Sequence, residues 1–330
     1  MSPVTLSVLD LAPVQVDATA GDALHATTRF AQHAEELDFR RFWVAEHHNM
    51  PGIASAAPAV VLAHLAASTS RIRVGSGGVM LPNHPPLVVA EQFGTLESLH
   101  PGRIDLGIGR APGTDPVTAR ALRRNAEGLA GDSFPRELTT LIGFFRGSDP
   151  DGIVASPGLG AEPEVWLLGS SGFSAQVAAA LGLPFAFAHH IAPDNTAAAL
   201  QLYRDNFRPS PTRSEPYTIV AASSVCADTD AEADRLAAPR DLAFANLRSG
   251  RPQAMATPEQ AAAFPGNDAE RHFAAQRKAG QLQGSPETVR AQAAHLLEAT
   301  APDELMLTTL VYDLDARIRS LELTRKAING

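Results

Sequence analysis

The amino-acid sequence predicts an α/β protein whose strands close into a (β/α)8 TIM barrel. Eight short apolar segments alternate with helical segments along the 330 residues, and eight is the number of strands that closes such a barrel. Most of these segments are apolar throughout, as is typical of parallel strands covered on both faces. The competing architecture, a doubly wound open sheet, more often carries G-x-G-x-x-G after its first strand, and "LDLAPVQ" has no such fingerprint.

The periodicity of apolar residues assigns each element in order. "TLSVLDL" and "RFWVAE" are strand-like, whereas residues 23–38 repeat apolar side chains at the spacing of three or four that is typical of a helix. "IRVGSGGVML" is the third strand, and Pro101-Gly102 ends the helix that follows it. The predicted strands are residues 5–11, 41–46, 72–81, 103–109, 164–170, 184–188, 217–227 and 304–311. The predicted helices are residues 23–38, 58–70, 87–99, 174–182, 194–206, 229–248, 285–299 and 314–328.

Two connections are too long for a single helix and predict insertions after strands 4 and 7. They span residues 110–163 and 228–303. Within the second, residues 248–283 are expected to form a lid-like insertion over one end of the barrel, because long loops in compact domains are often lids or mobile segments. We expect residues 1–330 to form a single domain.

Composition narrows the classes of function. The formal net charge is −9, whereas a nucleic-acid-binding surface would be basic. The one cysteine, Cys226, excludes an internal disulfide and any multi-cysteine metal site, and its small and apolar neighbours predict a buried packing role. No signal peptide and no long apolar run is evident. We therefore expect a cytoplasmic protein that binds neither nucleic acid nor membrane.

Residues at the ends of the predicted strands indicate a ligand with a phosphate group. In "GSGGVMLPNHPP", Gly77 and Gly78 interrupt a strand, which often marks a bulge or a close approach to the backbone. Arg110 follows the fourth strand, where its guanidinium suits phosphate oxygens; the alternative is an ion pair with Asp115. The loop "GSSGFS" opens a helix, and such a helix start binds anions or is simply capped by a serine. Its candidate phosphate contacts are Ser170, Ser171, Gly172 and Ser174.

Adjacent histidines raise the question of acid–base or metal chemistry. His47 and His48 follow the second strand and His189 and His190 follow the sixth, and neighbours on a strand point to opposite faces. One ring of each pair should therefore face the barrel, where it suits a general acid or base; a ring held by neighbouring backbone is the alternative. The H-x-H spacing usual in barrel metallohydrolases is missing, so no metal is expected. His47 and His48 are the candidate catalytic residues.

The chain resembles the bacterial luciferase-like flavin monooxygenases, most closely the single-chain oxidoreductases of unassigned substrate. The resemblance covers nearly the whole chain, strongest over residues 40–195 and weak across 228–283. It is carried by "FWVAEHHN", "RVGSGGVMLPNHPPLVVAEQFGTLESLHPGRIDLGIGRAPGTD" and "VWLLGSSGFSAQVAAALGLPFAFAHH". The reactive cysteine of the luciferases is missing at its position, so light emission and luciferase-type aldehyde oxidation are not implied.

The resemblance implies that FMN binds at the C-terminal mouth of the barrel. A cis peptide between Gly77 and Gly78 would lie against the flavin ring, and His47 would support the oxygen chemistry. The phosphate contacts of the family map to Arg110, Ser170, Ser171, Gly172 and Ser174.

The implied reaction uses reduced FMN and O₂ to oxygenate a small organic substrate through a flavin C4a-peroxide. A separate flavin reductase would supply the reduced flavin, because the chain has no nicotinamide fingerprint, and the family commonly forms homodimers. Three alternatives stay open: a deazaflavin-dependent hydride transferase on the same fold, a non-catalytic flavin-binding protein, and a metal-dependent barrel hydrolase.

Overall fold

Eight parallel strands close into a barrel in the computed structural model, which describes residues 3–122, 133–149, 151–267, 277–278 and 280–330. These strands are β1 (Thr5–Asp10), β2 (Arg41–Val44), β3 (Arg73–Met80), β4 (Ile104–Gly109), β5 (Glu164–Gly169), β6 (Phe185–Phe187), β7 (Thr218–Cys226) and β9 (Glu304–Thr308). Each of β1 to β6 pairs with the next, and the pairings β6–β7, β7–β9 and β9–β1 complete the ring. The predicted (β/α)8 fold class is confirmed, and each of the eight predicted strands is present.

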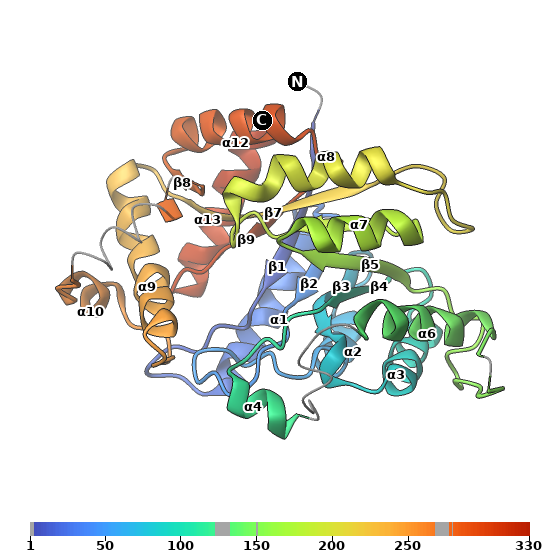
Figure 1. Ribbon diagram of the computed structural model, residues 1–330. Coiled ribbons are helices and arrows are strands. Elements are labelled where there is room, and N and C mark those ends of the chain that lie inside the picture. The colour runs from blue at the N-terminus through green and yellow to red at the C-terminus, as the bar shows by residue number, and fades with distance from the viewer. Residues whose placement is uncertain (1–2, 123–132, 150, 268–276, 279) are drawn as a thin grey trace.

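Helices surround the barrel (Figure 1). The two ends of the chain lie side by side, and a hydrogen bond joins them: the N–H of Val4 donates to Asn329 Oδ1 at 2.9 Å. The helices are α1 (Ala20–Glu36), α2 (Pro58–Ser68), α3 (Pro86–Leu99), α4 (Pro116–Ala121), α6 (Phe134–Arg146), α7 (Gly172–Leu181), α8 (Thr196–Asn206), α9 (Asp230–Arg248), α10 (Pro258–Ala263), α12 (Pro286–Thr300) and α13 (Leu314–Asn329), with short 3₁₀ turns η1 (Leu81–Asn83) and η2 (Pro193–Asn195).

Among the described residues, the sequence-based assignment misses one strand and three α-helices, all in the two insertions. Strand β8 (Leu282–Gly284) pairs with the last three residues of β7. It has three residues and α4 and α10 have six each, which is too short for hydrophobic periodicity to reveal. The fourth element, α6, buries Leu138 and Leu141 on one face, so its periodicity alone could have assigned it.

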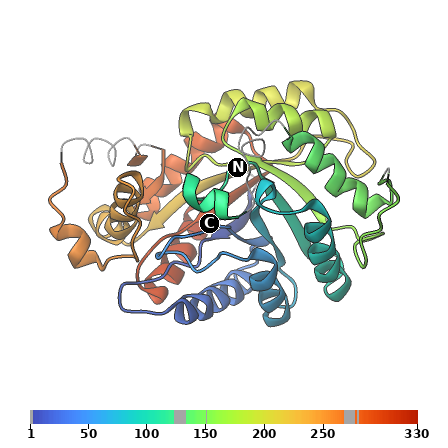
Figure 2. The same cartoon turned by 60° about the horizontal axis from the view of Figure 1, so that its bottom comes forward.

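The second insertion is attached to the barrel at defined points. Helices α9 and α10 stand together on one side of the barrel in both views (Figures 1 and 2). Between them, the N–H of Met255 donates to the carbonyl of Val14 at 2.8 Å, and Val16 donates back to Met255 at 3.0 Å. Of the segment 248–283 that was expected to be lid-like, residues 268–276 and 279 lie outside the described residues, and the lid stays a prediction.

Aromatic and charged side chains fill the barrel from its middle to the end where the strands begin. Trp43 packs edge-to-face against Trp166, with ring centroids 5.4 Å apart. Below them Arg41, 1% exposed, donates to Glu304 at 3.0 Å and to Asp105 at 2.9 Å. Burial opposes the charge on Arg41, but the surrounding carboxylates outweigh burial and raise its pKa. Burial raises the pKa of Glu304. This layer closes one end of the barrel and leaves the other end for a site.

No helix in the described part of the chain has both the length and the apolar run needed to cross a membrane.

Candidate functional site

A β-bulge in β3 shapes the wall of the barrel mouth. Gly77 is in register with Gly107 and Val79 with Ile108, so Gly78 is the extra residue, and the Gly77–Gly78 peptide is cis as expected. An added Cβ at Gly78 would lie 2.7 Å from the carbonyl oxygen of Gly107, and one at Gly77 would lie 2.5 Å from Leu9 Cδ1. Gly78 is therefore required by its close packing against the backbone of the barrel wall, whereas the nearest atom to Gly77 is the end of the flexible Leu9 side chain, which can move.

The bulge borders a cavity of about 240 Å³, which we call the bulge cavity. Apolar side chains from inside the barrel form much of its wall, including Leu9, Trp43 and Met306. Gly172 and His48 do not line it, although both are candidate site residues from the sequence. The other seven candidate catalytic and cofactor-binding residues do line it: His47, Gly77, Gly78, Arg110, Ser170, Ser171 and Ser174.

Arg110 lies beside the start of α7, at one end of the bulge cavity. Its guanidinium carbon is 4.4 Å from the centre of the Phe173 ring, and Phe173 is the second residue of α7. Ser171 precedes the helix, but its side chain makes no capping hydrogen bond, whereas Thr19 and Asp115 cap their own helices. Asp115 thus serves α4. The helix start, the serine hydroxyls and a guanidinium converge, and together they suit a phosphate group.

His47 and His190 line both the bulge cavity and a second cavity of about 320 Å³, which we call the outer cavity. His47 Nδ1 lies 3.2 Å from the carbonyl of Gly113, and His190 Nδ1 lies 2.9 Å from that of Ala221. A carbonyl only accepts, so each Nδ1 carries the proton. Burial lowers the pKa of His47 and lowers that of His190 to about 4. Both rings are therefore neutral at pH 7, with Nε2 as the acceptor nitrogen.

The expected alternation of adjacent histidines is present. His189 is buried and does not line either cavity; its Nδ1 lies 2.7 Å from the hydroxyl of Thr196. His48 points toward Glu46, and its Nε2 donates to Glu46 Oε1 at 2.8 Å. The period of two along a strand predicts that one ring of each pair faces the barrel, but it does not say which one, and so His190 could not be singled out.

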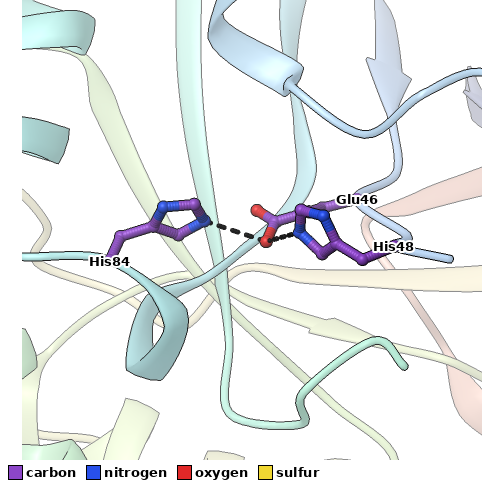
Figure 3. A group of neighbouring side chains, drawn as sticks. All are labelled: Glu46, His48 and His84. Carbon is purple, nitrogen blue, oxygen red and sulfur yellow. Dashed lines mark hydrogen bonds and ion pairs between the residues drawn. The ribbon is translucent and has the colours of Figure 1, made fainter. Parts of the chain in front are cut away.

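Glu46 is the centre of a hydrogen-bonded cluster behind the bulge cavity (Figure 3). The Glu46 carboxylate is fully buried, and its Oε1 accepts from His48 on one side and from His84 Nε2, at 2.9 Å, on the other. Its Oε2 accepts the N–H of Met80 at 3.1 Å, and Asn83 also donates to Oε1. Burial disfavours the charged form of Glu46, but these hydrogen bonds outweigh burial and lower its pKa. One carboxylate therefore holds the ends of β2 and β3 together.

Glu46, His48 and His84 also form a group whose ligand atoms are close enough to hold a metal ion. The sequence did not reveal this group, because His84 lies after β3 and η1 whereas Glu46 lies after β2, and only the fold brings them together. The sequence did carry one signal of the group: Glu46 follows an apolar strand. A carboxylate at such a position is costly to bury unless hydrogen-bond donors surround it. All three groups already hydrogen-bond to one another, and the expectation of no metal stays a prediction.

Cys226 has no place in either cavity. Its side chain is 1% exposed in the core between the barrel and its helices, and burial raises the pKa of the thiol to about 11. The thiolate needed for nucleophilic attack is therefore disfavoured, in agreement with the packing role expected from the sequence.

Comparison with known proteins gives one family match and three proteins that are similar over nearly the whole chain. The family model described as luciferase-like monooxygenase matches residues 4–304. A luciferase-like monooxygenase of Escherichia coli strain K12 is 46% identical over 321 residues, covering 97% of this chain and 96% of the relative. The N-acetyl-S-alkylcysteine monooxygenase of Bacillus subtilis strain 168 is 35% identical and covers 98% of each chain. The crystal structure of apo-MsnO8 superposes with a TM-score of 0.90 at 40% identity, with 98% of both chains covered.

Two more distant structures share the fold alone. The oxygenating constituent of 3,6-diketocamphane monooxygenase from Pseudomonas putida, a complex with FMN, has a TM-score of 0.72 at 21% identity and covers 99% of this chain and 98% of its own. An F420-dependent secondary alcohol dehydrogenase, bound to an F420–acetone adduct, has a TM-score of 0.72 at 16% identity with full coverage of both chains. The fold thus accommodates either kind of flavin cofactor.

Proposed function

The chain belongs to the luciferase-like monooxygenase family, and on this premise we propose that it is a monooxygenase that uses reduced FMN and O₂ to oxygenate a small organic substrate. The observation that carries the choice of cofactor is the position of Arg110. Its guanidinium stacks 4.4 Å from the ring of Phe173, so a cation stands beside the start of α7, in the wall of the cavity that Gly77 and Gly78 also border.

The residues of the bulge cavity fit FMN. Arg110, Ser170, Ser171 and Ser174 would hold the phosphate, because hydroxyls and the helix dipole favour an anion there. The apolar part of the cavity beside the Gly77–Gly78 peptide would hold the ring. When bound, reduced FMN supplies the electrons for splitting O₂, with one oxygen atom transferred to the substrate and the other released as water.

His47 acts at Nε2, on the boundary between the two cavities. Its Nδ1 proton is held by the carbonyl of Gly113, and burial keeps the ring neutral. At neutral pH it therefore accepts a hydrogen bond or a proton at Nε2 more readily than it gives one. Of the two roles expected from the sequence, general acid or general base, this arrangement favours the base. His48 holds Glu46 and acts on the geometry of the mouth.

The outer cavity adjoins the bulge cavity and holds the substrate. The name of the Bacillus subtilis relative, N-acetyl-S-alkylcysteine monooxygenase, supports the proposal that the substrate of this chain is a small organic molecule. A separate flavin reductase supplies the reduced FMN. The homodimer and the cytoplasmic location stay predictions.

The test compares cofactors on the purified protein and on Arg110→Gln. We expect FMN to bind at least tenfold more tightly than riboflavin, which lacks the phosphate. Arg110→Gln should weaken FMN binding roughly 10- to 100-fold, because hydrogen bonds to charged groups contribute about 1.5–3 kcal/mol, and should leave riboflavin affinity within about threefold. Arg146→Gln, at an exposed position in the last turn of α6, is the matched control.

The same titration separates the alternatives. Binding of a deazaflavin with no binding of FMN, oxidised or reduced, would indicate a hydride transferase. Tight FMN binding without O₂ uptake by the reduced complex in the presence of any organic substrate would indicate a non-catalytic flavoprotein. Equal affinities for FMN and riboflavin would remove Arg110 from the proposal.

A further inference from the structure

Two hydroxyl groups lie side by side in the wall of the outer cavity, near the ends of β7 and β9. Ser223 and Thr308 both line the cavity, and they are partners in the register of the two strands. Residues two apart on a strand point to the same face, and two residues earlier Ala221 and Met306 belong to the cluster of buried side chains inside the barrel. Both hydroxyls therefore belong to the layer above that cluster, at the mouth of the barrel.

The hydroxyl of Thr308 has no hydrogen-bond partner among the described residues, although the residue is only 4% exposed. A buried hydroxyl without a partner is unfavourable, which points to a ligand atom as its partner. The hydroxyl of Ser223 accepts from Arg240 Nη1 at 3.1 Å, and its own proton stays able to donate. Two donors can therefore converge on one oxygen atom of a ligand in the cavity.

His190 adds a hydrogen-bond acceptor to the same part of the wall. Its backbone N–H and its Nδ1 both donate to the carbonyl of Ala221, at 3.0 Å and 2.9 Å, so Nε2 is the acceptor, and no described residue donates to it. Ser223 lies two residues beyond Ala221, about 7 Å along the strand. One planar group can bridge that span with a hydrogen bond of about 2.9 Å at each side.

The rest of the cavity wall suits the apolar part of a small molecule. Its volume of about 320 Å³ lies at the lower end of the range for small-molecule pockets, and Met50, Ile53 and Leu247 are among its apolar side chains. Arg277 reaches the cavity from the second insertion, with its guanidinium carbon 3.6 Å from the centre of the Phe244 ring. The wall is shared in part with the bulge cavity, so a molecule held here reaches the place where the flavin ring is proposed to lie.

We infer that the substrate carries an amide group, whose carbonyl oxygen accepts from Ser223 and Thr308 and whose N–H donates to His190 Nε2. This inference rests on the proposed function, because it takes the outer cavity as the substrate site. An amide presents its acceptor and its donor on different atoms of one plane, whereas an alcohol presents both on one oxygen and spans less. A site built to hydrogen-bond a substrate group discriminates strongly against an analogue that lacks it, because buried protein groups are then left unpaired.

The test uses three probes of matched length on the FMN-loaded protein: N-butylacetamide, butyl acetate and butyl ethyl ether. The ester lacks the N–H, and the ether lacks the carbonyl as well. We expect calorimetry to show the amide bound roughly tenfold more tightly than the ester, and the ester more tightly than the ether. An amide costs more to remove from water than an ester does, so this order arises only where the site supplies the hydrogen bonds.

Two variants assign the order to its residues. His190→Phe keeps a ring but removes Nε2, so the amide and the ester should then bind within about threefold of each other. Thr308→Val keeps the shape of the side chain, and it should weaken the amide and the ester about tenfold while the ether changes less than about threefold. Because the hydroxyl of Thr308 has no described partner, this variant should not lower Tm. Thr139→Val on α6 and His25→Phe on α1 are exposed controls that should behave as wild type.

The outcomes separate this inference from the proposed function. If FMN fails to bind, the proposed function is wrong, and the three probes can still be compared on the protein without flavin. If FMN binds but the ester binds as well as the amide, the inference is wrong and the proposed function stands. An unchanged preference in His190→Phe, or unchanged affinities with a lower Tm in Thr308→Val, would also overturn it. If His190→Phe does not fold, the wild-type order and Thr308→Val decide.

Discussion

The two ends of the barrel use charge in opposite ways. Where the strands begin, three guanidiniums form a network of ion pairs with three carboxylates. The guanidiniums are those of Arg41, Arg73 and Arg213, and the carboxylates are those of Asp105, Glu164 and Glu304. Where the strands end, neutral imidazoles and apolar side chains line the cavities, and the cations Arg110 and Arg277 each stand in a cavity wall. The charges at the base are therefore paired inside the barrel, whereas Arg110 and Arg277 line cavities that a ligand can fill.

This difference separates stability from function along one axis, as is general in this fold. At the base, the Arg41 side chain is 1% exposed and Asp105 and Glu304 are 0% exposed, so each charge depends on the others. At the mouth, the fixed proton positions of His47 and His190 come from single backbone carbonyls. We therefore expect substitutions at the base to change the free energy of unfolding, and substitutions at the mouth to change ligand binding.

The largest effect is expected from Arg41→Met at the base. Removing this guanidinium leaves the buried carboxylates of Asp105 and Glu304 short of a partner, and breaking a buried ion pair in this way costs about 3–5 kcal/mol. Urea denaturation measures the loss. Provided that Arg41→Met folds, its affinity for FMN should stay within about threefold of the wild-type affinity.

Arg40→Gln is the matched control for that variant. Arg40 is the neighbouring residue, its side chain is 53% exposed, and it lies 3.9 Å from the same Glu304. Exposed ion pairs contribute little, so the change should stay below about 0.5 kcal/mol. A loss of less than about 1 kcal/mol in Arg41→Met would show that the base is not the stabilising end.

A smaller effect is expected at the mouth, and it depends on pH. Burial lowers the pKa of His190 from 6.5 to about 4, so between these values the unfolded chain binds more protons than the folded one. Stability from this residue is present above pH 6.5 and is lost as the pH falls toward 4. At pH 5 the loss is roughly 2 kcal/mol, at 1.36 kcal/mol per pH unit.

His190→Asn should remove this part of the pH dependence. The free energy of unfolding is measured at pH 7.5 and at pH 5 for both proteins, and the wild type should lose about 2 kcal/mol more than the variant between the two. Equal losses would mean that His190 is protonated in the folded protein, and its assigned role as an acceptor in the cavity wall would then fall.

The smallest effect lies outside both ends, at Cys226 in the outer core. Cys226→Ala should cost on the order of 1 kcal/mol through lost packing and should leave FMN binding unchanged. Because burial raises the pKa of this thiol to about 11, iodoacetamide should label it only as fast as the protein unfolds. Rapid labelling of the folded protein would contradict this prediction, because it would show that the Cys226 thiol is accessible and reactive without unfolding.

Hydrophobic periodicity alone was enough to predict the barrel. Each strand carries its own apolar signal, so "TLSVLDL" and "RFWVAE" could be assigned without knowledge of their neighbours. The closeness of the "GSSGFS" loop and Arg110 was also predictable, because they follow adjacent strands; phosphate binding there stays a prediction.

Features that depend on the closed barrel could not be predicted in this way. The reason for Gly78 is the carbonyl of Gly107 on the next strand, and the partner of Glu46 is His84 from another strand end. Arg277, which lines the outer cavity, lies in the segment where sequence pattern and family resemblance were least informative. In each case the partner is set by tertiary contact.

The shared acceptor at Glu46 couples the loops at three strand ends. His48, Met80 and His84 all donate to one carboxylate, and the hydroxyl of Thr114, after β4, donates to the carbonyl of His48. A loop copied alone from a relative would break hydrogen bonds that its neighbours need, so substitutions there should be non-additive. To obtain new specificities by recombining family members, the loops at the ends of β2, β3 and β4 would have to be exchanged together. The α9 residues that line the outer cavity, and Arg277, can be varied separately.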